Sequence, residues 1–124
     1  MRIVYCIPAT SNSGGMERVL TRKVNYLVGK GHELIIVTTD QKGAKPFFPL
    51  EGSVKQYDLG INYDENNGQG ILAKLTAYPK KKRLHRQRLR ELLEQLQADV
   101  VISMFGDDAT LLPQMKDGSR KVLE

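Results

Sequence analysis

The order of apolar and polar residues predicts alternating strands and helices. Residues 2–7 and 33–39 each hold a near-continuous apolar run, which is typical of a parallel strand buried on both faces. Between them, residues 16–30 place apolar side chains at helical spacing, and Gly31 follows where a left-handed cap would end a helix. We therefore expect a strand–helix–strand unit with parallel strands. The buried stripe of its helix should consist of Met16, Val19, Leu20, Val24, Leu27 and Val28.

The middle of the chain is less regular. Prolines and glycines mark residues 40–52 as a loop, residues 54–59 predict a weaker third strand, and the polar residues of 60–70 predict a mobile loop. The side chains expected to fold the first of these loops against the core are Phe47, Phe48 and Leu50.

Two further helical patterns meet at Pro79. Residues 71–78 favour a short helix and residues 80–97 a long one, so Pro79 either kinks one helix or begins a second at its first turn. Residues 99–104 then predict a fourth strand. The apolar stripe of the long helix consists of Leu84, Leu89, Leu92, Leu93 and Leu96.

The last part of the chain adds a short helix over 109–115 and a fifth apolar segment from 120 to 122. The whole pattern predicts an α/β fold, a three-layer Rossmann-like domain with a mostly parallel sheet over residues 1–122. Leu123 and Glu124 resemble residues that an expression vector leaves before a purification tag, so we expect an engineered fragment.

Composition is that of an ordinary globular domain. The 124 residues are 40% hydrophobic and 27% charged, with no apolar run long enough to span a membrane and no signal-peptide pattern at the start. The single cysteine, Cys6, is expected to be a small buried hydrophobe, and the location to be cytoplasmic. His32 and His85 are not spaced as metal ligands, so we expect both at the surface and no metal site.

The loop between the first strand and the first helix is the strongest candidate for binding. Ser13, Gly14, Gly15 and Met16 let the backbone approach a ligand, and unpaired amides at a helix start attract anions. The alternative is an ordinary tight turn from strand to helix. The G-x-G-x-x-G fingerprint, the P-loop and the G-x-S-x-G elbow are all missing from the sequence, so a nicotinamide enzyme is not expected and no cofactor is assigned.

Two acids follow the fourth predicted strand. In open α/β sheets ligands bind beyond the carboxyl ends of the strands, and Asp107 and Asp108 lie there. One of them could orient a hydroxyl of a sugar acceptor. The alternative is that one caps a helix while its neighbour occupies the first turn.

Positive charge is concentrated in residues 80–97. This segment holds seven Lys and Arg residues and two Glu residues, a net charge of +5, which equals that of the whole chain. The run suits a solvated helix face, an anionic membrane surface or nucleic acid, but no aromatic residues interleave with the charges to stack on bases, so nucleic acid is not favoured. The candidate membrane contacts are Lys80, Lys81, Lys82, Arg83 and Arg86.

Four stretches in this order resemble a known family. They are residues 2–5 (RIVY), 14–20 (GGMERVL), 31–38 (GHELIIVT) and 99–103 (DVVIS), and together they resemble the N-terminal half of group 1 retaining glycosyltransferases of the two-domain GT-B architecture. The resemblance implies two Rossmann-like domains that face each other across a cleft. The N-terminal domain recognises the acceptor, and the C-terminal domain, which is absent from this chain, holds the nucleotide-sugar donor.

The resemblance also implies roles for the glycine loop. Gly14 and Gly15, and more loosely Ser13 and Met16, would approach the diphosphate and the transferred sugar when the cleft closes. The family's sugar-contacting histidine would lie past the fifth strand, so no catalytic residue is assigned. The implied partners are a nucleotide-sugar donor, a glycan or lipid-linked acceptor and the inner membrane face. The implied process is the synthesis of cell-surface polysaccharide.

The fragment alone is expected to be inactive. Two other classes of protein stay open on the residues themselves. One is a stand-alone binding module of the flavodoxin or response-regulator type. A phosphoacceptor site would need acidic residues at the end of the first strand, where this sequence has Ile7, Pro8 and Ala9. The other is a nucleic-acid module that uses the basic helix over 80–97.

Overall fold

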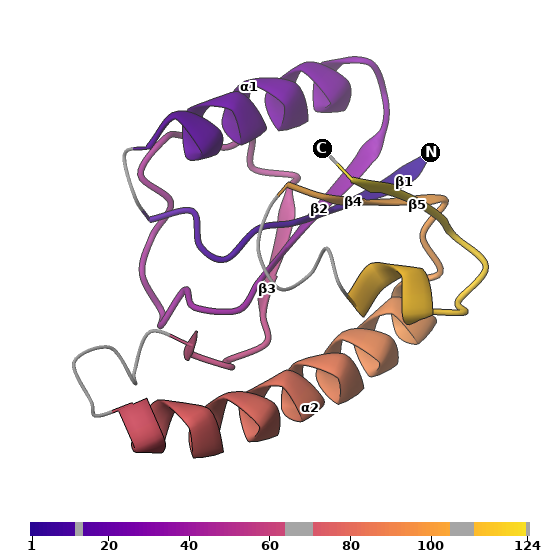
Figure 1. Ribbon diagram of the computed structural model, residues 1–124. Helices are drawn as coiled ribbons and strands as arrows, with labels where there is room; N and C mark the ends of the chain where they lie inside the picture. Colours follow the sequence, from indigo (N-terminus) through magenta and orange to yellow (C-terminus); the bar gives the residue numbers. More distant parts are fainter. Residues whose placement is uncertain (12–13, 64–70, 105–110, 124) are drawn as a thin grey trace.

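The computed structural model shows a parallel sheet with one long helix on each face (Figure 1). The structure describes residues 1–11, 14–63, 71–104 and 111–123, and of residues 71–74 and 76 it describes the backbone alone. Helix α1 (Gly15–Gly29) covers one face, and α2 (Ile71–Leu96) covers the other. The predicted three-layer Rossmann-like α/β fold is therefore confirmed.

The sheet has five strands in the order β3-β2-β1-β4-β5, and every neighbouring pair is parallel. The order reverses between β1 and β4, where one half of the sheet runs toward β3 and the other toward β5. Such a reversal is the switch point at which open α/β sheets bind ligands. The strands are β1 (Arg2–Cys6), β2 (Glu33–Thr38), β3 (Lys55–Asp58), β4 (Val100–Ser103) and β5 (Arg120–Leu123).

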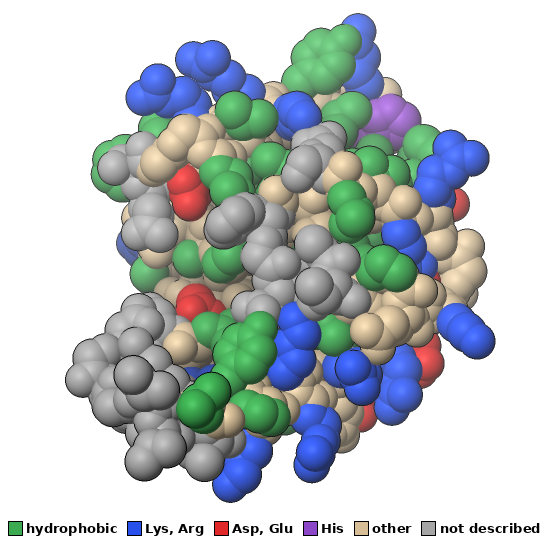
Figure 2. Space-filling model, viewed as in Figure 1, with side chains coloured by type: hydrophobic (Ala, Val, Ile, Leu, Met, Phe, Trp, Pro, Cys, Tyr) green, Lys and Arg blue, Asp and Glu red, His purple; other side chains and the backbone are tan. Residues whose placement is uncertain are grey.

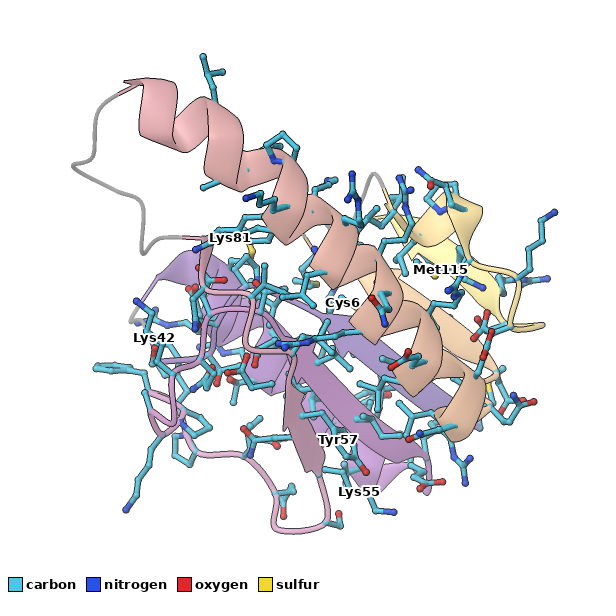
Figure 3. All side chains as sticks on the ribbon, turned by 90° about the horizontal axis from the view of Figure 1, so that it is seen from below. Cys6, Lys42, Lys55, Tyr57, Lys81 and Met115 are labelled. Carbon is cyan, nitrogen blue, oxygen red and sulfur yellow. The ribbon has the colours of Figure 1, made fainter. Side chains whose placement is uncertain are left out.

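Alternation along the buried strands sorts the core into two layers. In β1, Ile3 and Tyr5 point toward α1, whereas Val4 and Cys6 point toward α2. Figure 3, viewed from the side of α2, shows this helix lying across the strands with Cys6 beneath it. Cys6 is fully buried, as expected for a small hydrophobe.

Helix α1 follows its predicted bounds closely. Leu20 and Val24 are fully buried, and Gly31 takes the left-handed conformation with φ of +89° that ends the helix. The prediction is wrong for Val19, which is 44% exposed, because the buried stripe centres on Leu20 and Val24 and leaves Val19 to one side. The stripe members that pack at its margin are Met16, Leu27 and Val28.

Helix α2 runs through Pro79 without a break, so the alternative of a single long helix is correct and Pro79 does not begin a second one. Proline removes the hydrogen bond to the carbonyl of Leu75. Both residues are exposed at this point of the helix, so water can reach that carbonyl. Leu89 and Leu93 are fully buried against the sheet, as the leucine stripe predicts. None of the helices described is long and apolar enough to cross a membrane.

Two connecting segments differ from expectation. In the loop of residues 40–52, Leu50 packs on the core beneath α1, but Phe47 is 58% exposed, so its predicted packing is wrong. Of the helix expected over 109–115, residues 109 and 110 lie outside the described residues, Leu111 is helical, and the chain then continues as the 3₁₀ turn η2 (Leu112–Gln114) and leaves the helix at Met115. The fifth segment forms β5 as predicted, and its last residue, Leu123, lies opposite Ser103.

Candidate functional site

Gly14 and Gly15, which we call the glycine turn, lie on the connection from the carboxyl end of β1 to α1, beside the switch point of the sheet. Gly14 has an extended backbone (φ −68°, ψ 165°), and its carbonyl accepts the first hydrogen bond of α1 from the Arg18 amide at 3.2 Å. Within the described chain, no acceptor is assigned to the amides of Gly15, Met16 and Glu17. Among the described residues, the turn therefore presents donors without an assigned acceptor at the positive end of the helix dipole. Ser13 lies outside the described residues.

The carboxylate of Glu17 lies over this turn. A Cβ atom built on Gly14 would stand 2.5 Å from Glu17 Oε2, whereas one built on Gly15 meets nothing within 4 Å. An acid in the first turn stabilises the helix through the same dipole that would attract a ligand anion. A phosphate that approached Gly14 would therefore have to displace the Glu17 side chain, which is flexible enough to turn away.

The segment that leads from β1 toward the glycine turn is anchored by the loop that follows β2. The Pro8 carbonyl accepts from the amides of Thr39 and Asp40, at 3.1 and 2.8 Å, and the Thr10 amide donates to Gln41 Oε1 at 2.8 Å. Gln41 is only 9% exposed, and its Nε2 donates to the Ala44 carbonyl. Gln41 was missed by the sequence analysis, because a glutamine just after a strand looks like any loop residue.

The acids at this edge hold the backbone. Asp58 Oδ1 accepts from the Thr38 hydroxyl at 3.1 Å and from the Gln41 amide at 3.4 Å, and Asp40 Oδ1 accepts from the Tyr63 amide at 3.2 Å. Over the described ranges, no group of three His, Cys, Asp or Glu side chains is placed to hold a metal ion. Asp107 and Asp108, the predicted acceptor contacts, lie outside the described residues.

The prediction that His85 lies at the surface is wrong. Its side chain is fully buried on the inner face of α2, and its Nδ1 lies 2.8 Å from the Tyr63 hydroxyl, at hydrogen-bond distance. The signal was present in the sequence, because His85 precedes Leu89 and Leu93 by four and eight residues and so shares their helix face. His32 is half-buried, with Nδ1 3.2 Å from the terminal amino group.

The basic run on α2 divides into two groups. The Lys81 ammonium donates to the Asn62 carbonyl, and the Arg88 guanidinium donates to the carbonyls of Leu59 and Gly60, so these two cations hold the segment after β3. In Figure 3, Lys81 points toward this segment.

The other cations lie toward solvent. Lys80, Arg83 and Arg86 are exposed, and Figure 2 shows Lys and Arg side chains along the lower rim of the molecule, where α2 lies. A shallow groove of about 360 Å³ runs among them. It is lined by Tyr78, Pro79, Lys82, Arg83 and Arg86. Four of the five predicted membrane contacts are therefore on this surface or at its groove, and Lys81 is turned to the inner side.

Comparison with known proteins yields little. No protein-family model matches the chain, and no curated protein matches it. Among solved structures, it is similar to a crystal structure of UDP-galactose 4-epimerase, with 17% identity and a TM-score of 0.42. The match covers 84% of this chain but spans only 37% of that one, and a likeness of this size carries no functional information.

Proposed function

We propose that this chain is the acceptor-side domain of a retaining glycosyltransferase. The complete enzyme would move a sugar from a nucleotide-sugar donor to a glycan or lipid-linked acceptor in the synthesis of cell-surface polysaccharide. The observation that carries the proposal is the position of the glycine turn. Gly14 and Gly15 begin α1 at the carboxyl edge, next to the reversal of strand order between β1 and β4.

The chemistry of sugar transfer suits such a turn. A nucleoside diphosphate gains negative charge as it leaves the sugar, and preorganised amides stabilise charge that develops in a transition state. The amides of Gly15, Met16 and Glu17 are donors of this kind, and the open space at Gly15 lets a phosphate approach the backbone. Glu17 would move aside when the donor arrives. The donor itself would be held mainly by the second domain of the enzyme.

A transfer assay tests this proposal. Residues 1–124 and the complete product of the gene are incubated with radiolabelled nucleotide sugars and a lipid extract as acceptor source. We expect the complete product to transfer label into the lipid or polymer fraction, and residues 1–124 alone to transfer none. Transfer by residues 1–124 at the rate of the complete product, or the lack of a donor-binding domain in that product, would overturn the proposal.

A second proposal concerns the exposed side of α2. Exposed cations stand there beside two exposed apolar side chains, Leu75 at 64% and Tyr78 at 48%. Cations attract anionic headgroups while apolar groups enter the interface, so we propose that this face rests on an anionic membrane surface. Nucleic acid is the less suitable partner, because Tyr78 is the one aromatic residue within the helix.

Vesicle binding tests the membrane proposal. The protein is sedimented with phosphatidylglycerol vesicles and with phosphatidylcholine vesicles, and we expect binding to the anionic vesicles only. The double variant Arg83→Gln/Arg86→Gln should lower this binding about thirtyfold, at about 1 kcal/mol for each cation. A control that removes two charges elsewhere, Lys30→Gln/Lys45→Gln, should bind as the original protein does. Equal binding by the original protein and the arginine variant would contradict the proposal.

A further inference from the structure

A separate groove lies on the outer side of α1. It has a volume of about 570 Å³ and runs between the helix and the segment of residues 48–52. Arg18, Arg22 and Asn25 form its helical wall, because residues spaced by four and three share one helix face. Its size falls within the range of about 300–1,000 Å³ that is typical of small-molecule sites.

The wall opposite α1 is fixed in place. Asn25 donates from Nδ2 to the Pro49 carbonyl at 3.0 Å and accepts at Oδ1 from the Glu51 amide at 2.9 Å. Between these two bonds, Leu50 packs on the core beneath α1. Both sides of the groove are thus held before any ligand arrives, which lowers the entropic cost of binding.

The groove has an excess of positive charge. Arg18 and Arg22 are exposed and stand one helical turn apart, and neither forms an ion pair within the part of the chain that is described. Glu51 is the acidic residue in the lining, so two positive charges face one negative charge. Guanidinium groups are suited to carboxylate and phosphate, which they bind through two parallel hydrogen bonds.

An aromatic ring lies beside these cations. The Arg18 guanidinium carbon is 5.5 Å from the centre of the Phe48 ring, a cation–π contact that directs Arg18 over the groove. Phe48 in turn packs edge-on against Phe47, with ring centres 5.0 Å apart. The groove therefore offers an apolar surface and two anion-binding groups side by side, where α1 leaves the glycine turn.

We infer that this groove binds an acidic sugar. The carboxylate or phosphate of the sugar would pair with Arg18 and Arg22, and the C–H face of its ring would lie against Phe48. The inference goes beyond the proposed transferase activity and does not need it, because the groove is separate from the amides of the glycine turn and its binding can be measured directly.

Amide chemical shifts of the ¹⁵N-labelled protein test the inference. The probes are glucuronate, glucose 6-phosphate, neutral glucose and inorganic phosphate, at constant ionic strength. We expect glucuronate, glucose 6-phosphate or both to shift the amides of residues 18–25 and 48–52, and the two arms show which anion is preferred. Glucose should cause no shift, and inorganic phosphate should bind about tenfold more weakly than the preferred sugar. No shift with either acidic sugar, or equal affinity for inorganic phosphate, would overturn the inference.

Variants identify the groups responsible. Arg18→Gln and Arg22→Gln should each weaken binding of the preferred acidic sugar about tenfold. Phe48→Leu should weaken the acidic sugar but leave inorganic phosphate unchanged. Arg90→Gln, which removes one exposed cation from α2, is the matched control and should bind as the original protein does. Unchanged amide positions outside the groove would show that each variant is folded, and equal losses in all three arginine variants would mean general charge attraction and would overturn the site.

Discussion

The amino edge of the parallel sheet, where the strands begin, and the carboxyl edge, where they end, are held by different kinds of contact. At the amino edge, opposite charges pair: Arg2 Nε donates to Glu33 Oε2 at 2.9 Å, and Lys121 Nζ donates to Asp117 Oδ1 at 2.5 Å. At the carboxyl edge, side chains connect to backbone groups or to neutral side chains, as Asp58 and Asp40 do when they accept from the amides of Gln41 and Tyr63. The Thr10 amide donates to Gln41, and Tyr63 lies at hydrogen-bond distance from His85.

This difference separates charged groups that are already paired from backbone donors that have no described acceptor. The hydrogen bond from Arg2 keeps the pKa of Glu33 below its ordinary value, so that carboxylate is already engaged. Burial raises the pKa of Asp117, but hydrogen bonds from Lys121 and Ser119 outweigh it and leave the pKa lowered. At the carboxyl edge, by contrast, the first amides of α1 have no described acceptor. The amino edge is therefore held by ion pairs, whereas the first amides of α1 at the carboxyl edge are candidate donors for a ligand.

The largest expected effect is at His85. Replacing it with alanine removes a fully buried side chain and leaves the Tyr63 hydroxyl without its ring partner. We expect His85→Ala to lower the free energy of unfolding by about 3 kcal/mol, as measured by urea denaturation. His32→Ala, at the half-buried histidine, is the control and should cost less than about 0.5 kcal/mol. A loss at His85 no larger than this control would mean that the carboxyl edge does not depend on the buried pair.

A smaller effect is expected at Gln41. Gln41→Ala deprives the buried Thr10 amide of its acceptor, so the segment between β1 and the glycine turn would lose this anchor. The expected loss in the free energy of unfolding is about 2 kcal/mol, the typical cost of a buried donor left unpaired. Gln95→Ala, at an exposed position of α2, should change the free energy of unfolding by no more than about 0.5 kcal/mol. Equal stability of the two variants would show that the loop is held by other contacts.

Most of the fold could be predicted from the sequence, because it follows from patterns of local period. The apolar runs at β1 and β2 and the stripe of α1 each have a clear period and a clear end, such as Gly31. The long α2 was predicted only as one of two alternatives. A proline at this position is compatible either with a kink inside one helix or with the first turn of a second helix. The predictions that Val19 and Phe47 are buried were wrong. The pattern of apolar residues indicates which face of a segment is buried, but it does not show how far the buried contact extends.

The candidate site was predicted less well, because it depends on contacts between distant segments. The glycine turn was found from local chemistry alone. Gln41 lies 31 residues from Thr10 in the sequence, and no pattern connects the two. His85 was misplaced because its type was given more weight than its position, four residues before Leu89 on a buried stripe. The strand-order switch needs the pairing of β1 with β4, which no single segment encodes.

The ion pair of Asp117 at the amino edge should make the stability of the protein depend on pH. Because the pKa of Asp117 is lower in the folded protein, the unfolded chain binds a proton first as pH falls. Stability from this group is therefore fully present above the ordinary value of 3.8 and is lost as pH falls through the lower folded value.

Asp117→Asn should cost about 1 kcal/mol at pH 7 and flatten the fall in stability below about pH 4, as measured by urea unfolding at a series of pH values. Glu94→Gln, at an exposed position of α2, should keep the slope of the original protein. The comparison of the two edges would fail if Asp117→Asn and the original protein had parallel pH profiles.

The smallest effect on stability is expected at Gly15, in the glycine turn of the carboxyl edge. A Cβ atom there meets nothing within 4 Å, so Gly15→Ala should leave the free energy of unfolding unchanged or raise it by up to about 1 kcal/mol. Gly31→Ala should instead cost about 1 kcal/mol, because φ is +89°.

In the complete glycosyltransferase that we propose, the same Gly15→Ala change should lower sugar transfer at least about tenfold, since the methyl group would stand where a phosphate approaches the amides. Gly29→Ala, at the other end of α1, also meets open space and should leave transfer unchanged. A Gly15→Ala enzyme with full transfer would show that the glycine turn is an ordinary helix start. Loss of transfer without loss of stability would instead support the proposal that the first amides of α1, which have no acceptor among the described residues, bind the ligand.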